Sequence, residues 1–183
     1  SSVLAGLSRA MSLSNPCNAH RDFVLDIIAP LYSSWLYQIF EDAQNRGIER
    51  VYFCARDAYQ LYKMAVQMQK TFPTLGVEYV YISRQSLYKD DNEEAKLAYF
   101  RHVGLATKSE KVAVVDVTTS GETLRFLNAF FVKNGFKEVI GYYYLLWNKV
   151  EGVDRSKYVV KVYDENIRAR AVFDRFLQFL FIR

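Results

Sequence analysis

A run of hydroxyl-bearing residues after an apolar segment is the part of this sequence best suited to bind a phosphate. Residues 112–124 read VAVVDVTTSGETL, so a strand-like segment leads into an aspartate and then into threonine, serine and glycine. Hydroxyls and free backbone N–H groups at the start of a helix bind phosphate well, because the helix dipole is positive at that end. The candidate phosphate ligands are Thr118, Thr119, Ser120, Gly121, Glu122 and Thr123.

Asp116 precedes these hydroxyls and needs a different role. A carboxylate repels a phosphate, but it accepts hydrogen bonds from sugar hydroxyls, and it can hold Mg²⁺ between itself and a pyrophosphate. We therefore predict a functional role for Asp116, with Mg²⁺ as the candidate cofactor and with no residue assigned as a dedicated metal ligand. The simpler alternative is a strand followed by a capped helix, with Ser120 as the N-cap.

Two other polar groups follow apolar segments. Arg56 and Asp57 come after residues 50–55, and Arg84 comes after residues 77–82. If these segments are parallel strands, their carboxyl ends meet at one edge of the sheet, where ligands of α/β proteins bind. We therefore predict that Arg56 and Asp57 face the same pocket as Asp116. The alternatives are an ion pair between Arg56 and Asp57, an N-cap role for Asp57 and a solvated Arg84.

The elements that must position these residues alternate along the chain. Apolar residues at helical spacing over 22–43, with a stop at Gly47, predict two helices or one bent helix, reset at Pro30. Strand-like segments then alternate with helical patterns, as in a doubly wound α/β fold. We predict a mainly parallel five-stranded sheet, with an N-terminal helical extension at 1–47 and the α/β domain at 48–183. The predicted strands are 50–55, 77–82, 112–116, 138–146 and 158–163, and a final helix starts near Ile167.

The connection at residues 84–111 is long for a compact domain. It is polar at its start and has a helical pattern in its middle. Connections of this length contain a helix of their own or act as a lid over a site. The flanking helices should bury Leu61, Met64, Ala65 and Met68 on one side, and Leu124, Leu127 and Phe131 on the other, the second helix ending at Asn134 and Gly135.

Composition limits the class of protein. A chain of 183 residues that is 51% hydrophobic can form one core without disulfides, and Cys17 and Cys54 lie far apart. The net charge of +4 comes from scattered basic residues, which suits a small phosphorylated ligand and argues against nucleic acid. Apolar stretches of about ten residues are too short to cross a bilayer, so we predict a soluble, cytoplasmic protein without membrane contact. The lack of an initial methionine and the apolar end predict a fragment of a longer protein.

The third strand-like segment resembles the ribose-5-phosphate loop of type I phosphoribosyltransferases. That loop follows a hydrophobic strand with two acidic residues, a short spacer and then Thr-Thr-Gly-x-Thr. Residues 115–124 match this pattern in register, except that Val115 occupies the first acidic position. The resemblance extends over about residues 48–147 in the order of elements, and it implies a phosphoribosyltransferase-like fold.

The resemblance also implies roles for the candidate residues. Residues 118–123 would bind a 5-phosphate, Asp116 would be the catalytic residue that contacts the ribose hydroxyls, and residues 85–110 would close over the substrate. Arg56, Asp57 and Arg84 would contact the pyrophosphate with Mg²⁺. Catalysis would then be electrostatic stabilisation of the leaving pyrophosphate. Trp147 and Tyr142 to Tyr144 follow the fourth strand, near where such transferases stack a base, and core packing explains these tyrosines equally well.

A second resemblance involves the same segments. Residues 47–59, 81–87 and 115–123 are similar to a bacterial segment often joined to hydrolase domains of the haloacid-dehalogenase type, in proteins associated with surface-polysaccharide genes. It implies a non-catalytic ligand-binding or accessory domain, with a covalently linked hydrolase domain or a second copy of the chain as partner. The sequence therefore leaves two hypotheses open, a phosphoribosyltransferase and a binding module.

Two hydrolase motifs fit the sequence less well. A cysteine phosphatase loop needs five residues between its cysteine and its arginine, whereas only one residue separates Cys54 from Arg56. Asp116-Val117-Thr118 resembles the nucleophile motif of haloacid-dehalogenase-type phosphatases, which usually place a second aspartate where this chain has Thr118. We therefore predict that Cys54 is a buried strand residue and that Asp116 is not a phosphate acceptor.

Overall fold

The computed structural model describes residues 19–82, 92–105, 107–119, 122–146 and 158–160, together with Gly6, Ala10 and Leu13. The chain forms two compact units, Ser1–Asp42 and Ala43–Arg183, which are considered separately. The predicted division between residues 47 and 48 stays a prediction. The predicted helix from Ile167 and the end of the predicted fifth strand lie outside the described residues.

One continuous helical run comes first, and most of it belongs to the first unit. Pro30 has no N–H to donate, and just before it the N–H of Ala29 bonds the carbonyl of Val24, which is the spacing of a π-turn. The run therefore resets near Pro30, as predicted, without a break. Its parts are α2 (Ala19–Phe23), the π-helix η1 (Val24–Ile28) and α3 (Ala29–Asn45).

The same run passes a simple test for a membrane span. Arg21–Asn45 is long and apolar enough to cross a membrane by length and composition, although it contains scattered charges. The buried helix of a soluble protein and a signal sequence pass this test too, so one such helix is weak evidence. The sequence-based expectation of no membrane contact therefore stays a prediction.

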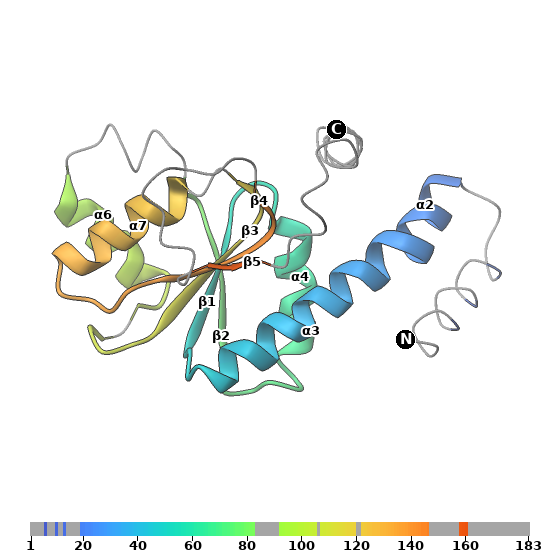
Figure 1. The fold of residues 1–183 in the computed structure, drawn as a ribbon, viewed down its shortest axis with the longest axis horizontal. Coiled ribbons are helices and arrows are strands. Elements are labelled where there is room, and N and C mark those ends of the chain that lie inside the picture. Colours follow the sequence, from blue (N-terminus) through green and yellow to red (C-terminus); the bar gives the residue numbers. More distant parts are fainter. Residues whose placement is uncertain are drawn as a thin grey trace. The chain divides into compact units, whose positions relative to one another are not determined.

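The second unit is built on a parallel sheet (Figure 1). Its strand order is β2-β1-β3-β4-β5, and every neighbouring pair is parallel. This confirms the predicted doubly wound α/β fold with a five-stranded sheet. The strands are β1 (Arg50–Cys54), β2 (Gly76–Val80), β3 (Val112–Thr119), β4 (Ile140–Leu146) and β5 (Tyr158–Val160).

The third strand is longer than the sequence predicts. β3 runs to Thr119, three residues beyond the predicted end, because Thr118 and Thr119 pair with Leu145 and Leu146 of β4. Threonine is β-branched and favours extended structure. Two of the predicted loop residues are therefore part of the sheet.

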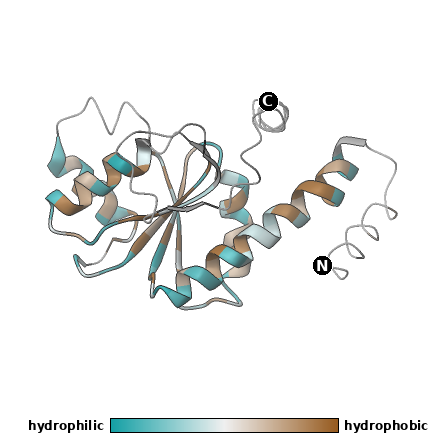
Figure 2. Cartoon of the chain, viewed as in Figure 1, coloured by the Kyte–Doolittle hydropathy of each residue, from teal (hydrophilic) through white to brown (hydrophobic). Residues whose placement is uncertain are grey.

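Helices cover both faces of the sheet, with α4 on one face and α6 and α7 on the other (Figure 1). Successive residues of β1 contact helices on opposite faces of the sheet. Phe53 contacts Tyr62 of α4, whereas its neighbour Tyr52 contacts Phe100 of α6. Figure 2 shows hydrophilic and hydrophobic residues on the same helices, as expected when one face packs on a sheet. The helices are α4 (Tyr59–Met68), α6 (Glu93–His102) and α7 (Glu122–Lys133).

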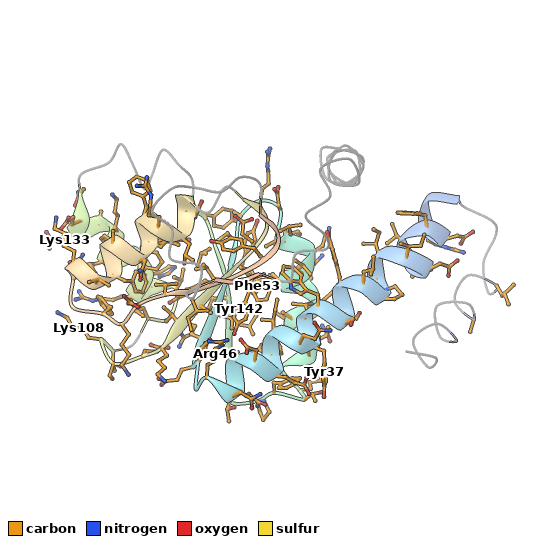
Figure 3. All side chains as sticks on the ribbon, in the orientation of Figure 1. Tyr37, Arg46, Phe53, Lys108, Lys133 and Tyr142 are labelled. Carbon is orange, nitrogen blue, oxygen red and sulfur yellow. The ribbon has the colours of Figure 1, made fainter. Side chains whose placement is uncertain are left out.

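The predicted inner faces of these helices are largely confirmed. Leu61 and Ala65 of α4 are buried, while its two methionines are only half-buried. Tyr142 and Phe53 lie on the sheet inside the domain, whereas Lys108 and Lys133 lie at its periphery (Figure 3). The face of α7 is buried as predicted at Leu124, Leu127 and Phe131.

The stretch between β2 and β3 contains the helix predicted in its middle. Asn92 caps α6 by accepting a hydrogen bond from the N–H of Ala95 at 3.0 Å. Phe100 is 2% exposed and holds α6 against the core through ring contacts with α7 and β1. Within the described residues this stretch is therefore an anchored helix, and the predicted lid role stays a prediction. Residues 83–91 and 106 lie outside the described residues.

Glycine ends two helices where the sequence predicts a stop. Gly47, after α3, has φ +65°, and Gly135, after α7, has φ +79°. The N–H of Phe136 bonds the carbonyl of Phe131 at 2.9 Å, which is the bond of a Schellman motif. Glycine adopts this left-handed conformation without the strain that a Cβ atom adds.

A charged cluster closes the opposite edge of the sheet, at the amino end of β1. Arg50 Nε donates to Glu110 Oε1 at 2.8 Å, and Arg50 Nη1 lies 3.6 Å from Glu78 Oε1. Glu110 is only 6% exposed, so displacement of Arg50 would remove the ion pair that stabilises this buried carboxylate. A Cβ atom at Gly104, which has φ +92°, would lie 2.5 Å from Arg50 Nη1.

Gly104→Ala is expected to destabilise the protein by about 2 kcal/mol, because it adds left-handed strain and also displaces Arg50 from Glu110. Gly135→Ala is the matched control, since its Cβ atom would meet only the mobile Lys108 side chain, at 3.4 Å. We expect the control to cost about 1 kcal/mol, the strain alone. Urea unfolding followed by circular dichroism measures both, and equal losses would show that Arg50 moves aside without cost.

Candidate functional site

The strand order reverses between β1 and β3. The helix that follows β1 covers one face of the sheet, and the helix that follows β3 covers the other face (Figure 1). Ligands of doubly wound α/β proteins bind at such a point, outside the carboxyl ends of the strands. The segments after Cys54 and after Thr119 both leave the sheet at this edge.

Asp116 lies near the end of β3, beside Cys54 of β1. The strand register pairs Phe53 with Val115, so the next residues, Cys54 and Asp116, are neighbours across the two strands. Val115 is fully buried, whereas Asp116 is half-buried. Neighbours on a strand point to opposite faces, so an acidic residue at position 115 would lie on the other face of the sheet from Asp116.

The environment of Asp116 favours the protonated carboxyl group. The pKa of Asp116 is raised from 3.8 to about 7, mainly by burial and in addition by the negative charge of Asp57. The backbone N–H of Val117 bonds the carboxylate and partly opposes this shift. A functional carboxyl group with a pKa near neutrality is a common property of ligand and catalytic sites, where charge partners are brought together.

The segment after β1 brings Asp57 close enough to Asp116 for their charges to interact. Residues 55–58 form a turn in which Arg56 is exposed and Asp57 is half-buried, and the peptide bond between Ala55 and Arg56 is cis. The helix that follows starts at Tyr59, with Ala58 at the N-cap position and no side-chain cap bond. The alternative that Asp57 caps this helix is therefore wrong, because the helix begins one residue later than that role requires.

The predicted phosphate ligands lie at the end of β3 and the start of α7. Thr118 and Thr119 belong to the strand, Glu122 begins the helix, and Thr123 is half-buried in its first turn. Only residues 120 and 121 separate the two elements, and they lie outside the described residues, as does Arg84. The roles of these residues therefore stay predictions.

Cys54 is a buried thiol. It is 3% exposed and forms no disulfide. Burial raises the pKa of the Cys54 thiol well above its ordinary value, and the charge of Asp116 adds to this effect. A thiolate is the nucleophilic form of cysteine, so Cys54 is poorly suited to a phosphatase reaction. The prediction of a buried strand residue is confirmed.

The carboxylates of Asp57 and Asp116 have the chemistry that Mg²⁺ requires. Among the described residues, no group of three or more His, Cys, Asp or Glu side chains could hold a metal ion alone. Mg²⁺, however, is usually held by one or two carboxylates together with water and the phosphates of a substrate. Asp116, with the charge of Asp57 near it, therefore fits an ion that arrives with a phosphorylated ligand.

Sequence reasoning missed a group of aromatic residues beside this edge. The pKa of Tyr79 is raised mainly by burial, then by Tyr81 and Tyr59, and to a smaller extent by the charge of Asp57. The end of β2 therefore also lies near the turn after β1. Tyr81, just beyond β2, is 73% exposed, and its N–H donates to Tyr99 Oη of α6 at 2.7 Å. The signal was present as alternating tyrosines at the end of the second strand, but alternation there reads most simply as core packing.

Fold and site together define a doubly wound α/β domain with a carboxylate pair at its switch point. No protein-family model and no curated protein matches the chain. Among solved structures, it is similar to purine phosphoribosyltransferase from Pyrococcus horikoshii Ot3, with 14% identity over 71% of this chain and 80% of that chain, and a TM-score of 0.47.

The chain is also similar to two HPRTs mutants from an analysis of an invariant aspartic acid. The glutamine mutant has 12% identity over 74% of this chain and 75% of that chain, with a TM-score of 0.49. The glutamic acid mutant has 13% identity over the same shares, with a TM-score of 0.46. The function proposed for the domain rests on the geometry of the site.

Proposed function

We propose that this domain binds a sugar phosphate or a nucleotide phosphate at the β1/β3 edge, in the manner of a phosphoribosyltransferase. The observation that carries this proposal is that Asp57, in the turn after β1, lies close enough to Asp116 of β3 for their charges to interact at the switch point of the sheet. Asp116 would accept hydrogen bonds from sugar hydroxyls. The exposed Arg56 would contact a second, distal phosphate group.

The phosphate itself would bind at the junction of β3 and α7. This junction follows directly from Asp116, and the helix begins at Glu122 with its positive dipole end toward the edge. The sequence supplies hydroxyls at 118, 119, 120 and 123 and a glycine at 121. The phosphate site would then begin two residues after Asp116 along the same strand, so one sugar phosphate could contact both.

Mg²⁺ would be held by Asp57 and Asp116 together with phosphate oxygens of the ligand. When bound, it would neutralise negative charge on a diphosphate and make that group a better leaving group. Its positive charge would also lower the pKa of Asp116, so ligand binding and ionisation of Asp116 would support each other. Below about pH 7 Asp116 is mostly protonated, and we therefore expect weaker Mg²⁺-dependent binding there.

We propose binding with little or no transferase activity. Val115 is fully buried on the opposite face from Asp116, so this strand offers one carboxylate where the phosphoribosyltransferase pattern has two. Asp57 lies in the turn after β1, so it does not occupy the position of the carboxylate that is missing at residue 115. The single carboxylate on this strand supports a ligand-binding or accessory role in a cytoplasmic protein. Such a domain could assist a covalently linked hydrolase domain of the haloacid-dehalogenase type.

Isothermal titration calorimetry with phosphoribosyl pyrophosphate and Mg²⁺ at pH 8 tests the binding site. We expect saturable heat for the natural chain and at least about tenfold weaker binding for Asp116→Asn and for Asp57→Asn, a loss of about 1.4 kcal/mol each. Glu94→Gln is the matched control, because it removes one carboxylate from an exposed position on α6. No heat from the natural chain would refute the phosphate-binding proposal.

Release of pyrophosphate separates the two roles. Phosphoribosyl pyrophosphate and Mg²⁺ are incubated with the protein and with free purine or pyrimidine bases, and pyrophosphate is measured. We expect no release above the level of the Asp116→Asn variant. Base-dependent release that this substitution abolishes would instead establish the transferase hypothesis.

A further inference from the structure

Four tyrosines form a patch on the outside of the domain, next to Asp57. Tyr59 and Tyr62 lie on α4, and Tyr79 and Tyr81 lie at the end of β2. Tyr79 is the centre of the patch, with ring centroids 5.3 Å from Tyr59, 5.5 Å from Tyr62 and 5.1 Å from Tyr81. We call these four residues the tyrosine patch.

The patch is unusually open for an aromatic cluster. Tyr81 is 73% exposed and Tyr59 is 43% exposed, although aromatic side chains normally bury most of their surface. Lys63 Nζ lies 5.2 Å from the centroid of the Tyr59 ring and interacts with that ring. Tyr81 therefore offers the largest open ring surface in the patch.

Neighbouring contacts hold Tyr81 in place before any ligand arrives. Its backbone N–H donates to Tyr99 Oη at 2.7 Å, which ties it to α6. Its ring meets Tyr79 edge to face, at an interplanar angle of 80°. A ring fixed in this way loses little freedom when it contacts a ligand, so it can contribute affinity at small entropic cost.

The patch lies at a suitable distance from the carboxylate pair. Val80 pairs with Cys54 of β1, and Cys54 neighbours Asp116 of β3, so the three residues lie level across three strands. Tyr79 lies on the face that α4 covers and Asp116 on the other face, so a shared ligand would cross the carboxyl edge of the sheet. Adjacent strands are about 4.8 Å apart, which places Val80 of β2 roughly 10 Å from Asp116 of β3. One nucleoside phosphate can span this distance, with its phosphate at β3 and its base at β2.

Two tyrosines of the other candidate surface for a base are buried. The sequence allowed base stacking by tyrosines of the fourth strand, but Tyr142 is 1% exposed and Tyr143 is fully buried. Both are therefore core residues of β4. Trp147 lies outside the described residues.

We propose that the tyrosine patch stacks the nucleobase of a nucleotide whose phosphate binds at the β3 edge, so that the ligand is a nucleotide and not a plain sugar phosphate. This inference rests on the proposed function and selects among the ligands that it allows. Bases stack on aromatic side chains regardless of their identity, because every base has a flat π-face. Tyr81 contributes the largest part of this surface, and Asp57 lies between the base and the phosphate.

Competition among simple ligands tests the proposal. Adenosine 5′-monophosphate, uridine 5′-monophosphate, ribose 5-phosphate and adenosine are titrated into the protein with Mg²⁺ at pH 8. We expect the tighter of the two nucleotides to bind at least about tenfold more strongly than ribose 5-phosphate, as stacking of one base allows. Tyr81→Ala should remove this advantage and leave ribose 5-phosphate binding unchanged.

Two variants control the assignment. Tyr81→Phe keeps the ring and should keep the nucleotide preference, whereas Tyr37→Ala removes a 46% exposed tyrosine from α3 and should change nothing. Equal affinities for ribose 5-phosphate and the nucleotides, or a nucleotide preference that persists in Tyr81→Ala, would refute the base-stacking role of the patch. The proposed phosphate site would be unaffected by either result. Binding of adenosine alone, lost in Tyr81→Ala, would instead keep the patch and overturn the phosphate site. No binding of any of the four ligands would overturn both.

Discussion

Asp116→Asn is expected to stabilise the protein by about 2–3 kcal/mol at pH 8 and to change its stability little at pH 4. The pKa of Asp116 is about 7 in the folded chain and 3.8 in the reference state, so between these values the folded chain holds a proton that the unfolded chain has lost. Stability therefore falls as the pH rises from about 4 to about 7, and it levels off above that. Asparagine has no charge to bury and retains an oxygen for the N–H of Val117.

The size of this effect follows from the shift. About three pH units at 1.36 kcal/mol each set an upper limit of about 4 kcal/mol, and partial exposure of Asp116 lowers the expected value. Urea unfolding at several pH values between 4 and 8 measures the difference. Glu94→Gln should give a curve parallel to that of the natural chain, and a parallel curve for Asp116→Asn would show that Asp116 ionises normally. The same substitution that weakens ligand binding is thus expected to strengthen the fold.

Phe100→Ala is expected to destabilise the α/β domain by about 3–5 kcal/mol. Phe100 is 2% exposed, and its ring lies 5.0 Å from Phe131 and 5.9 Å from Tyr52 and Phe130 between centroids. Truncation would leave a cavity between α6, α7 and β1, because two rings of α7 and one of β1 surround this position. Chemical denaturation followed by circular dichroism measures the loss.

Phe130→Ala is the matched control for this prediction. Phe130 is an aromatic residue of α7 in the same cluster, but it is only half-buried, so we expect a loss of about 1–2 kcal/mol. Similar losses for both variants would contradict the central position of Phe100. A small loss for Phe100→Ala would show that α6 can separate from the sheet, which the proposed lid over the site would require.

The fold could be predicted because its strands are buried on both faces. Val112 to Val115 and Val51 to Cys54 are continuous apolar segments between helical patterns, and this arrangement leaves few folds other than a parallel α/β sheet. The end of the third strand was harder to predict from the sequence. A polar Asp116 suggested a stop there, whereas pairing of Thr118 and Thr119 with β4 continues the strand.

Part of the candidate site follows from the sequence and part does not. Asp57 and Asp116 could be predicted to meet, because both follow buried strands and parallel strands share one carboxyl edge. The raised pKa of Asp116 could not, since it depends on the burial that neighbouring side chains create. The tyrosine patch could not be predicted from the sequence either. Tyr59 lies on a helix and Tyr79 on a strand, and their contact depends on how α4 packs on the sheet.

The burial of Val115 has a consequence for how the two carboxylates are spaced. Two acids on one strand keep a fixed separation, whereas Asp116 lies within β3 and Asp57 lies in the turn after β1. Their separation can therefore adjust to the ion or the hydroxyl groups between them when either segment shifts. A site of this kind gives up a rigid geometry for the reacting atoms, but it can accept ligands of several sizes, which suits a receptor for nucleotides better than a catalyst.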